Sequence, residues 1–146
     1  MIIVVDTNIL FSACLTPSGR LFQILLNANP SAQFISSHLA IDELSEHKIK
    51  LQTLSKISPA DLAILIEVVL KPIEFFDYRI IDRDHWREAD RLTKDVDGDD
   101  VSFVALALQT NGWLWTGDKK LSVHLKSMGF AKVIGTAELF DLLSNQ

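Results

Sequence analysis

The chain opens on four branched apolar residues, Ile2 to Val5, and this run ends at an acid, Asp6. An unbroken apolar run of this length is typical of a strand buried on both faces, as in a parallel sheet. Open parallel sheets bind their ligands beyond the carboxyl ends of the strands, which is where Asp6 would lie. The first strand therefore predicts an α/β fold with a carboxylate at its functional edge.

Strand-like and helical patterns alternate along the rest of the chain. Short apolar runs at 33–36, 73–76, 113–116 and 132–134 predict further strands. Helices are expected near 21–28, after a Ser37 cap, over 59–70 after a Ser58 cap, over 84–96, from the acidic turn 97–100 to Gly112, after Asp118, and after a Thr136 cap. This alternation predicts a single α/β domain over 1–146, a three-layer α/β/α sandwich with a mainly parallel central sheet of four to five strands.

Composition and charge narrow the functional classes. The net charge of −5 argues against a passive nucleic-acid binder, because affinity for phosphate backbones usually comes from basic surface. Cys14 is the only cysteine, so no intramolecular disulfide forms, and a small buried residue is the simplest interpretation. Without a basic leader or an apolar stretch of ~18–20 residues, we expect a soluble cytoplasmic protein that does not associate with membranes.

Three further acids are placed where this fold would bring them near Asp6. Asp118 follows the strand at 113–116 as Asp6 follows the first strand. Asp100 stands in the first turn of a helix that is apolar nearly all round, and Glu43 lies at the edge of an apolar helical face. We therefore expect Asp6, Glu43, Asp100 and Asp118 to gather at one edge of the sheet.

Each of these acids also has a simpler interpretation when taken singly. Asp118 suits a helix cap, as do Asp97 and Asp99, whereas Asp100 suits the helix dipole and Glu43 the solvent. Together, however, they would repel, since two like charges ~4 Å apart lose ~4 kcal/mol at an effective dielectric of 20. Such a cluster needs protons or cations, and oxygen-only ligands favour Mg²⁺ or Mn²⁺.

Other metal sites and catalytic motifs do not fit the spacing. Alternating acids at 95, 97 and 99 begin like an EF-hand loop, but Asp100 replaces its glycine and Leu106 its closing glutamate. The histidines form neither a His-Glu-x-x-His nor a Glu-x-x-His pair, and there is no nucleophile elbow, phosphate-binding loop or dinucleotide fingerprint. These observations leave the carboxylates as the chemical centre.

Three segments resemble those of the PIN-domain nucleases, a family that includes the VapC-type toxins. They are Val5-Asp6-Thr7-Asn8, the run from Asp97-Gly98-Asp99-Asp100 to Ala107, and Trp115-Thr116-Gly117-Asp118. The resemblance spans essentially the whole chain and implies a PIN-like fold and a ribonuclease that uses Mg²⁺ or Mn²⁺.

Carried onto this sequence, the resemblance implies four metal-binding catalytic acids. They are Asp6, Glu43, Asp100 and Asp118, supported by Thr7, Asn8, Asp99 and Thr116. Which member of the doublet Asp99–Asp100 is the ligand stays open. The resemblance also implies a small antitoxin partner and a homodimer. The hypothesis is hydrolysis of RNA phosphodiester bonds by a metal-activated water, without a covalent nucleophile.

The basic residues supply candidates for RNA contact. Where the family often has another acid, two residues after Asp118, this chain has Lys120, and Lys119 or Lys120 is a candidate phosphate contact. Arg83, Arg87 and Arg91 recur every fourth residue on one predicted helix face. Acids interleave with these arginines, so ordinary surface ion pairs are the alternative interpretation.

Two alternative functions remain open at this point. A magnesium-dependent phosphatase or phosphotransfer domain also keeps acids at strand ends, although Thr7 and Asn8 occupy the places where such domains usually carry a second acid. A catalytically degenerate PIN fold that binds a protein partner is the other alternative, and the four intact acids argue against it.

Overall fold

The fold is built on one parallel sheet. A computed structural model describes residues 1–27, 29–96 and 98–145. Within them the sheet has five strands in the order β3-β2-β1-β4-β5, and every neighbouring pair is parallel. The strands are β1 (Ile2–Val5), β2 (Gln33–Ser37), β3 (Ile73–Phe76), β4 (Trp113–Trp115) and β5 (Val133–Ile134). The predicted α/β/α sandwich with a parallel central sheet is confirmed.

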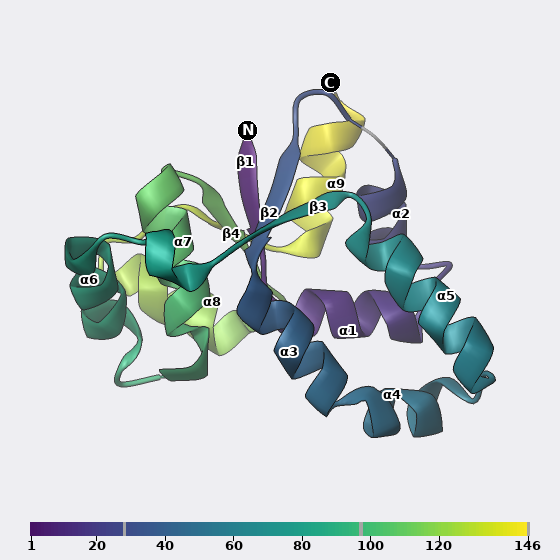
Figure 1. The fold of residues 1–146 in the computed structure, drawn as a ribbon. Helices are drawn as coiled ribbons and strands as arrows, with labels where there is room; N and C mark the ends of the chain where they lie inside the picture. The colour runs from purple at the N-terminus through teal and green to yellow at the C-terminus, as the bar shows by residue number, and fades with distance from the viewer. Residues whose placement is uncertain (28, 97, 146) are drawn as a thin grey trace.

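Helices cover both faces of the sheet (Figure 1). They are α1 (Thr7–Leu15), α2 (Arg20–Leu26), α3 (His38–Glu46), α4 (Lys48–Ser55), α5 (Pro59–Leu70), α6 (Arg83–Thr93), α7 (Val101–Thr110), α8 (Lys119–Ser127) and α9 (Thr136–Ser144), with short 3₁₀ turns η1 (Tyr78–Ile80) and η2 (Gly98–Asp100). Helices α6, α7 and α8 lie on one side of the sheet, and α1, α2 and α5 on the other, where α9 packs against α2. In the described part of the chain, no single helix is long and apolar enough to cross a membrane. Helices α1 and α2, which are bent by 107° relative to each other, reach the required length and apolar composition only when taken together.

The central strand β1 is buried as its sequence predicts. Ile3, Val4 and Val5 are all fully buried, with β2 on one side and β4 on the other. Apolar contacts continue into the neighbouring strands, where the rings of Phe34 and Trp115 lie 6.0 Å apart. Burying branched side chains on both faces removes most of their apolar surface from water, which contributes ~1.5–3 kcal/mol for each large residue.

Helix α7 covers the face of the sheet that lies away from α1, α2 and α5. Its residues from Ser102 to Ala107 are buried, because α7 packs against β1, β2 and β4 on one side and α6 on the other. The apolar pattern all round this helix is therefore explained by its position between the sheet and a second helix. Cys14 is buried in α1, and burial raises the pKa of its thiol to about 11, which agrees with a core residue.

Several predicted helix ends are confirmed and others are displaced. The hydroxyls of Ser37 and Ser58 cap α3 and α5 as expected, by accepting from the backbone N–H of Leu39 and Asp61. The Thr136 cap is wrong: Gly135 occupies the cap position, and the Thr136 hydroxyl instead accepts from the Trp115 indole N–H at 3.1 Å.

Two other helices differ from their predicted extents. Helices α1 and α4 were not predicted as helices, and the helix expected over 84–96 spans Arg83–Thr93. Helix α2 ends at Leu26, and Ala28, where the predicted helix stopped, lies outside the described residues.

Gly112 provides a test of how tightly β1 and β4 are packed. Asn111, in the left-handed conformation, ends α7, and a Cβ added at Gly112 would lie 2.9 Å from Ile2 Cγ2 and 3.1 Å from its carbonyl oxygen. We expect Gly112→Ala to lower the free energy of unfolding by about 1–3 kcal/mol, because the backbone of β1 must move. Urea unfolding measures this change, and Gly117→Ala, where no atom lies within 4 Å, is the control.

Candidate active site

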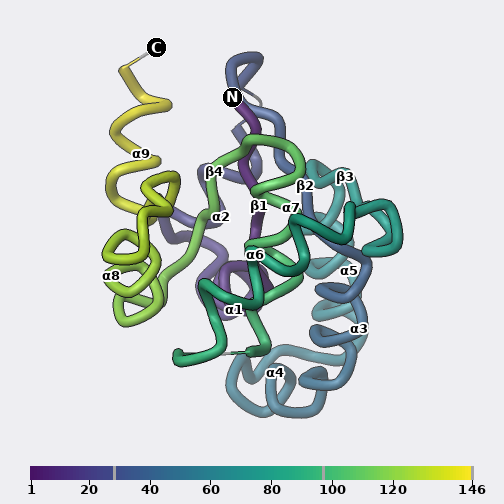
Figure 2. Tube along the Cα trace, turned by 90° about the vertical axis from the view of Figure 1, so that its left-hand side faces the viewer, coloured from purple at the N-terminus to yellow at the C-terminus, as the bar shows by residue number. Residues whose placement is uncertain are grey.

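The candidate site lies where the direction of strand succession reverses. From β1 the chain first adds β2 and β3 on one side, and then β4 and β5 on the other. Such a switch point leaves a crevice outside the carboxyl ends of the two central strands. Val5 is paired with Trp115, so the next residues, Asp6 and Thr116, follow neighbouring strand ends. Figures 1 and 2 show α1, α3 and α8 at this end of the sheet, opposite the chain termini.

Asp6 is a buried carboxylate at the end of the central strand. Its side chain is 2% exposed, and its Oδ1 accepts from the backbone N–H of Ile9 at 2.9 Å, so Asp6 also caps α1. The pKa of Asp6 is raised from 3.8 to about 6, chiefly by burial and to a lesser degree by repulsion from Asp118, although hydrogen bonds from Thr116, Ile9 and Asn8 lower it. The carboxylate is held in place but disfavoured in its charged form.

Thr116 connects the two strand-end acids. Its hydroxyl hydrogen-bonds to the Asp6 carboxylate and accepts from the backbone N–H of Asp118 at 3.1 Å. Asp118 is half-buried, and its Oδ1 caps α8 by accepting from Leu121 N–H at 3.0 Å. The capping interpretation of Asp118 is thus correct for one oxygen, and the same residue lies close enough to Asp6 to repel it.

Glu43 reaches the site from α3. Its Oε2 accepts a hydrogen bond of 2.6 Å from the hydroxyl of Thr7, the residue after Asp6. Thr7 is buried and Glu43 half-buried, so the carboxylate lies at the edge of an apolar helical face, as its spacing predicts. Asn8 is exposed, and its backbone N–H hydrogen-bonds to Asp6. Thr7 therefore positions Glu43 beside the first turn of α1.

Asp100 occupies the start of α7, at the same end of the sheet. It is 9% exposed, whereas Asp99 in the preceding 3₁₀ turn is exposed. The cap position of α7 is taken by Asp100, with φ −89° and ψ 0°, rather than by Asp99 as the sequence suggested. Asp97, the other expected cap, lies outside the described residues. Burial favours Asp100 over Asp99 as the inward-facing member of the doublet.

The structure brings some of the predicted residues together more closely than others. Asp6, Thr116 and Asp118 form one connected group, and Thr7 with Glu43 forms a second beside it. Among residues 1–27, 29–96 and 98–145, no three His, Cys, Asp or Glu side chains are grouped closely enough to hold a metal ion. Asp118 repels Asp6, and the Glu43 carboxylate is hydrogen-bonded to Thr7.

The charge and donor set nevertheless suit a hard cation. Within the described part of the chain, no Lys or Arg forms an ion pair with Asp6, Glu43 or Asp118. A buried carboxylate with a raised pKa, next to a second carboxylate, gains from any positive charge placed between them. Oxygen ligands of this type fit Mg²⁺ or Mn²⁺ rather than zinc.

The predicted basic contacts differ in how far they are already paired. On α6, Arg91 hydrogen-bonds to Glu88 at 2.6 Å and lowers the pKa of that carboxyl, and Arg87 lies 4.0 Å from Asp84. Arg83 is exposed at the start of the same helix. These contacts support the surface-pair interpretation for most of the arginine stripe.

Lys119 and Lys120 begin α8, directly after Asp118, and both are exposed. Lys119 lines an open groove of about 460 Å³ that also contains Thr116, Gly117 and Lys126. This groove therefore begins at the strand end that carries Thr116, and an RNA contact by these lysines remains a prediction.

A pocket of about 180 Å³ adjoins the acids on the other side. Its lining residues are Thr7, Asn8, Phe11, Glu43, His47 and Lys50. Phe11, His47 and Lys50 were not among the predicted site residues, although the i, i+4 spacing of Glu43 and His47 was a visible signal.

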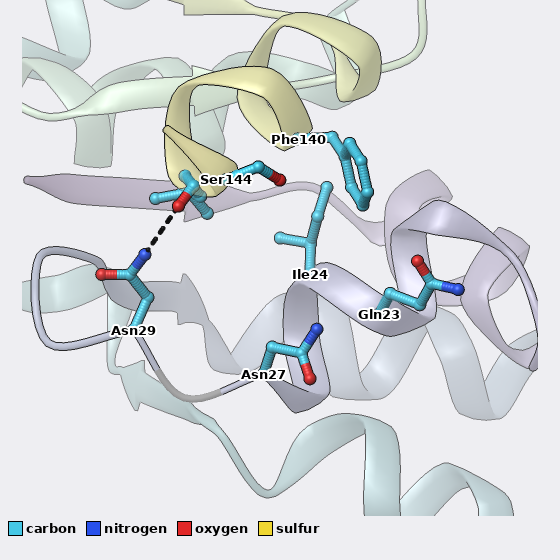
Figure 3. A pocket seen from close by; sticks show the side chains of 7 residues that line it. Gln23, Ile24, Asn27, Asn29, Phe140 and Ser144 are labelled. Atoms are coloured by element: carbon cyan, nitrogen blue, oxygen red, sulfur yellow. Dashed lines mark hydrogen bonds between the residues drawn. The ribbon is translucent and has the colours of Figure 1, made fainter. Parts of the chain in front are cut away.

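A different pocket lies between α2 and α9, away from the acids. It has a volume of about 170 Å³, and Figure 3 shows Gln23, Asn27 and Asn29 around one side of it and Phe140 and Ser144, on α9, around the other. Asn29 donates to the carbonyl oxygen of Leu143 at 3.2 Å. None of the predicted acids lines this pocket, so it is unrelated to the site at the strand ends.

A comparison with models of protein families shows to which family this chain belongs. A family model described as PIN domain matches residues 4–133, which is most of the sequence. The chain belongs to the PIN-domain family. The resemblance carried by the three sequence segments is thereby confirmed. No curated protein matches the sequence at a significant level.

Solved structures of low sequence identity share this PIN fold. VapBC2 from Rickettsia felis, bound to a DNA fragment from their promoter, matches with a TM-score of 0.69 and 16% identity, over 92% of this chain and 98% of that chain. PAE2754 from Pyrobaculum aerophilum matches with a TM-score of 0.67 and 17% identity, over 99% of this chain and 96% of that chain. VapBC-1 from nontypeable Haemophilus influenzae matches with a TM-score of 0.63 and 15% identity, over 94% of this chain and 99% of that chain. At these identities the likeness establishes the fold.

The raised pKa of Asp6 predicts a pH-dependent gain in stability when its charge is removed. Because the pKa is about 6 in the folded state and 3.8 ordinarily, the folded protein binds more protons between these values and loses stability as pH rises through them. Asp6→Asn keeps the helix cap and removes the charge. Without metal, the free energy of unfolding of this variant should exceed that of the wild type by about 2–3 kcal/mol at pH 8 and should nearly equal it near pH 4.

Urea unfolding in EDTA at the two pH values measures this effect. Asp141→Asn, an exposed acid on α9, removes the same charge without the burial and serves as the control. Equal stability of wild type and Asp6→Asn at pH 8 would show that the charge on Asp6 does not destabilise the folded protein.

Proposed function

We propose that this PIN-domain protein is a metal-dependent endoribonuclease that hydrolyses RNA phosphodiester bonds at the sheet edge. The observation that carries the proposal is the buried Asp6 carboxylate, which lies beside Asp118 at the switch point and forms no ion pair with a Lys or Arg among the residues that the structure describes. A fold rarely keeps such a charge without a functional reason, since burial and repulsion both destabilise it. The catalytic acids are Asp6, Glu43, Asp100 and Asp118.

The division of labour among these residues follows from their contacts. The four acids would hold Mg²⁺ or Mn²⁺, with Asp6 as the most buried ligand. Thr116 orients Asp6 and fixes the backbone of Asp118, and Thr7 orients Glu43. When bound, the metal would neutralise phosphate charge and lower the pKa of a water molecule. Asn8 and Asp99 have supporting places at the rim, and no side chain acts as a covalent nucleophile.

The partners are proposed from the fold comparison. Two of the similar solved structures are named VapBC2 and VapBC-1, and each aligns with nearly the full length of this chain. We infer that this chain is the toxin of a toxin–antitoxin pair, acts in the cytoplasm on RNA, forms a homodimer and binds a small antitoxin protein. The whole proposal treats 1–146 as one PIN-like domain.

Loss of the central ligand should remove activity without unfolding the protein. In the Asp6→Asn variant, cleavage of a mixed single-stranded RNA in Mn²⁺ should fall by at least about 100-fold, because a neutral amide holds a cation poorly. The measurement needs protein free of contaminating nuclease, and circular dichroism of the variant shows that the fold is kept. An unchanged cleavage rate would contradict the mechanism.

The metal is tested separately from the chemistry. Adding Mn²⁺ should raise the thermal unfolding midpoint of the wild type and leave that of Asp6→Ala nearly unchanged, because an ion that binds only the folded state stabilises it by mass action. A wild type without any shift would remove the metal from the proposal, whatever the outcome of the cleavage assay.

The two acids before α7 offer a matched pair of variants. Asp100→Asn should lower cleavage about as much as Asp6→Asn, whereas Asp99→Asn should retain most of the activity, because Asp100 is buried and Asp99 exposed. Both substitutions remove one charge at neighbouring positions, so their difference reports the position of the ligand. The reverse order of activities would assign the ligand to Asp99.

A further inference from the structure

The pocket beside Glu43 combines aromatic and cationic side chains. Phe11 forms part of its wall, and Lys50 Nζ lies 5.8 Å from the centre of the Phe11 ring. The His47 ring meets Phe11 edge-on, with centroids 6.3 Å apart and planes at 83°. The same pocket contains Thr7, Asn8 and Glu43, so it is continuous with the acids.

These three side chains come from separate elements that converge on the strand ends. Phe11 is one helical turn after Thr7 in α1, and His47 stands at the break between α3 and α4. That break turns the chain, so that Lys50, in the first turn of α4, returns to the side of α1. Their meeting depends on the α3–α4 break, which the sequence pattern did not reveal.

The charge on α4 contrasts with that on α6. Helix α4 has the sequence KIKLQTLS, with exposed lysines at 48 and 50 and no acid. On α6, by contrast, Arg87 and Arg91 face Asp84 and Glu88 within the same helix. Lys50 is therefore better placed than the arginine stripe to neutralise an RNA phosphate that reaches the acids.

The size of the pocket limits what it can hold. At about 180 Å³ it is smaller than the ~300–1,000 Å³ of pockets for drug-sized ligands, so it suits one planar ring better than a peptide segment. Bases of single-stranded RNA stack on aromatic side chains, and lysines follow the backbone. The contact between Lys50 and Phe11 is a weak one at an exposed side chain, so an incoming base can replace it.

We propose that this pocket is a nucleotide-binding subsite, in which Phe11 stacks on an RNA base next to the scissile bond, His47 supports the Phe11 ring edge-on, and Lys50 binds the phosphate of that nucleotide. The subsite rests on the proposed ribonuclease function and adds the position of the flanking nucleotide. The RNA strand would then enter between α1 and α4 and continue past Glu43 to the acids at the ends of β1 and β4.

Binding of an uncleavable RNA tests the subsite apart from catalysis. The probe is a fluorescent 2′-O-methyl RNA of about six nucleotides and mixed sequence, titrated without metal. Lys50→Gln should weaken binding about fivefold and reduce the slope of log affinity against log salt by ~0.7, the share of one phosphate contact. Phe11→Leu should weaken binding about tenfold, and Phe11→Tyr should bind as the wild type does, because it keeps a stacking ring.

Matched controls separate the subsite from general effects of charge and stability. Lys71→Gln removes the same charge from an exposed residue after α5, and its affinity should equal that of the wild type. Thermal unfolding of each variant identifies any loss of fold, and the Phe11→Tyr variant keeps the test valid if Phe11→Leu is unstable.

Three outcomes would overturn the subsite. If Lys50→Gln and Lys71→Gln weaken binding equally, the pocket has no special role, although cleavage by the wild type would leave the ribonuclease proposal intact. If the variants bind RNA normally and lose only a protein partner, the pocket belongs to that partner. A wild type that neither binds nor cleaves RNA would overturn both proposals together.

Discussion

The organisation of this protein depends on the burial of one carboxylate at the end of its central strand. Asp6 closes β1, caps α1 and is held by the Thr116 hydroxyl from the adjacent strand end. These bonds lower its pKa, but burial and Asp118 raise it, so the charged form is less favoured here than in an aspartate exposed to water. The strand order places Asp6 and Asp118 at one crevice, because the helices that follow strands on opposite sides of β1 diverge there.

The two interpretations of these acids, as helix caps and as candidate metal ligands, are compatible with each other. Asp6 and Asp118 each use Oδ1 to cap the helix that follows, as ordinary capping residues do. Capping fixes the orientation of each carboxylate without occupying it fully, because a carboxylate accepts several hydrogen bonds. A strand-end cap therefore fixes the direction of a carboxylate and leaves it able to accept further bonds.

Most of the fold was predictable because local patterns and tertiary context agree. The apolar run of β1, the Ser58–Pro59 start of α5 and the apolar sequence of α7 all specify buried or capped elements by themselves. Thr136 was misassigned because its hydroxyl bonds to Trp115, a contact across the sheet that no local rule reveals. The α3–α4 break at His47 was missed for a similar reason, since no glycine or proline marks it.

The candidate site was less predictable than the fold. Position on strand ends placed Asp6 and Asp118, but the links through Thr7 and Thr116 depend on how α3 and β4 pack. Phe11 lies in an apolar stretch that was not predicted as a helix, and only its half-exposed position beside α4 distinguishes it from the core. Pockets arise from gaps between elements, and a sequence pattern contains no measure of those gaps.

The capping bond of Asp6 has one more geometric consequence. Because α1 begins at the very next residue, no flexible loop separates the strand end from the first helical turn. Thr7 and Phe11 are then about 6 Å apart along a rigid helix axis, at ~1.5 Å per residue. The backbone spacing between the buried acid and Phe11 is therefore set by the helix and not by a loop. A ligand that binds across this edge meets a fixed backbone, and only side-chain rotamers are left to adjust to it.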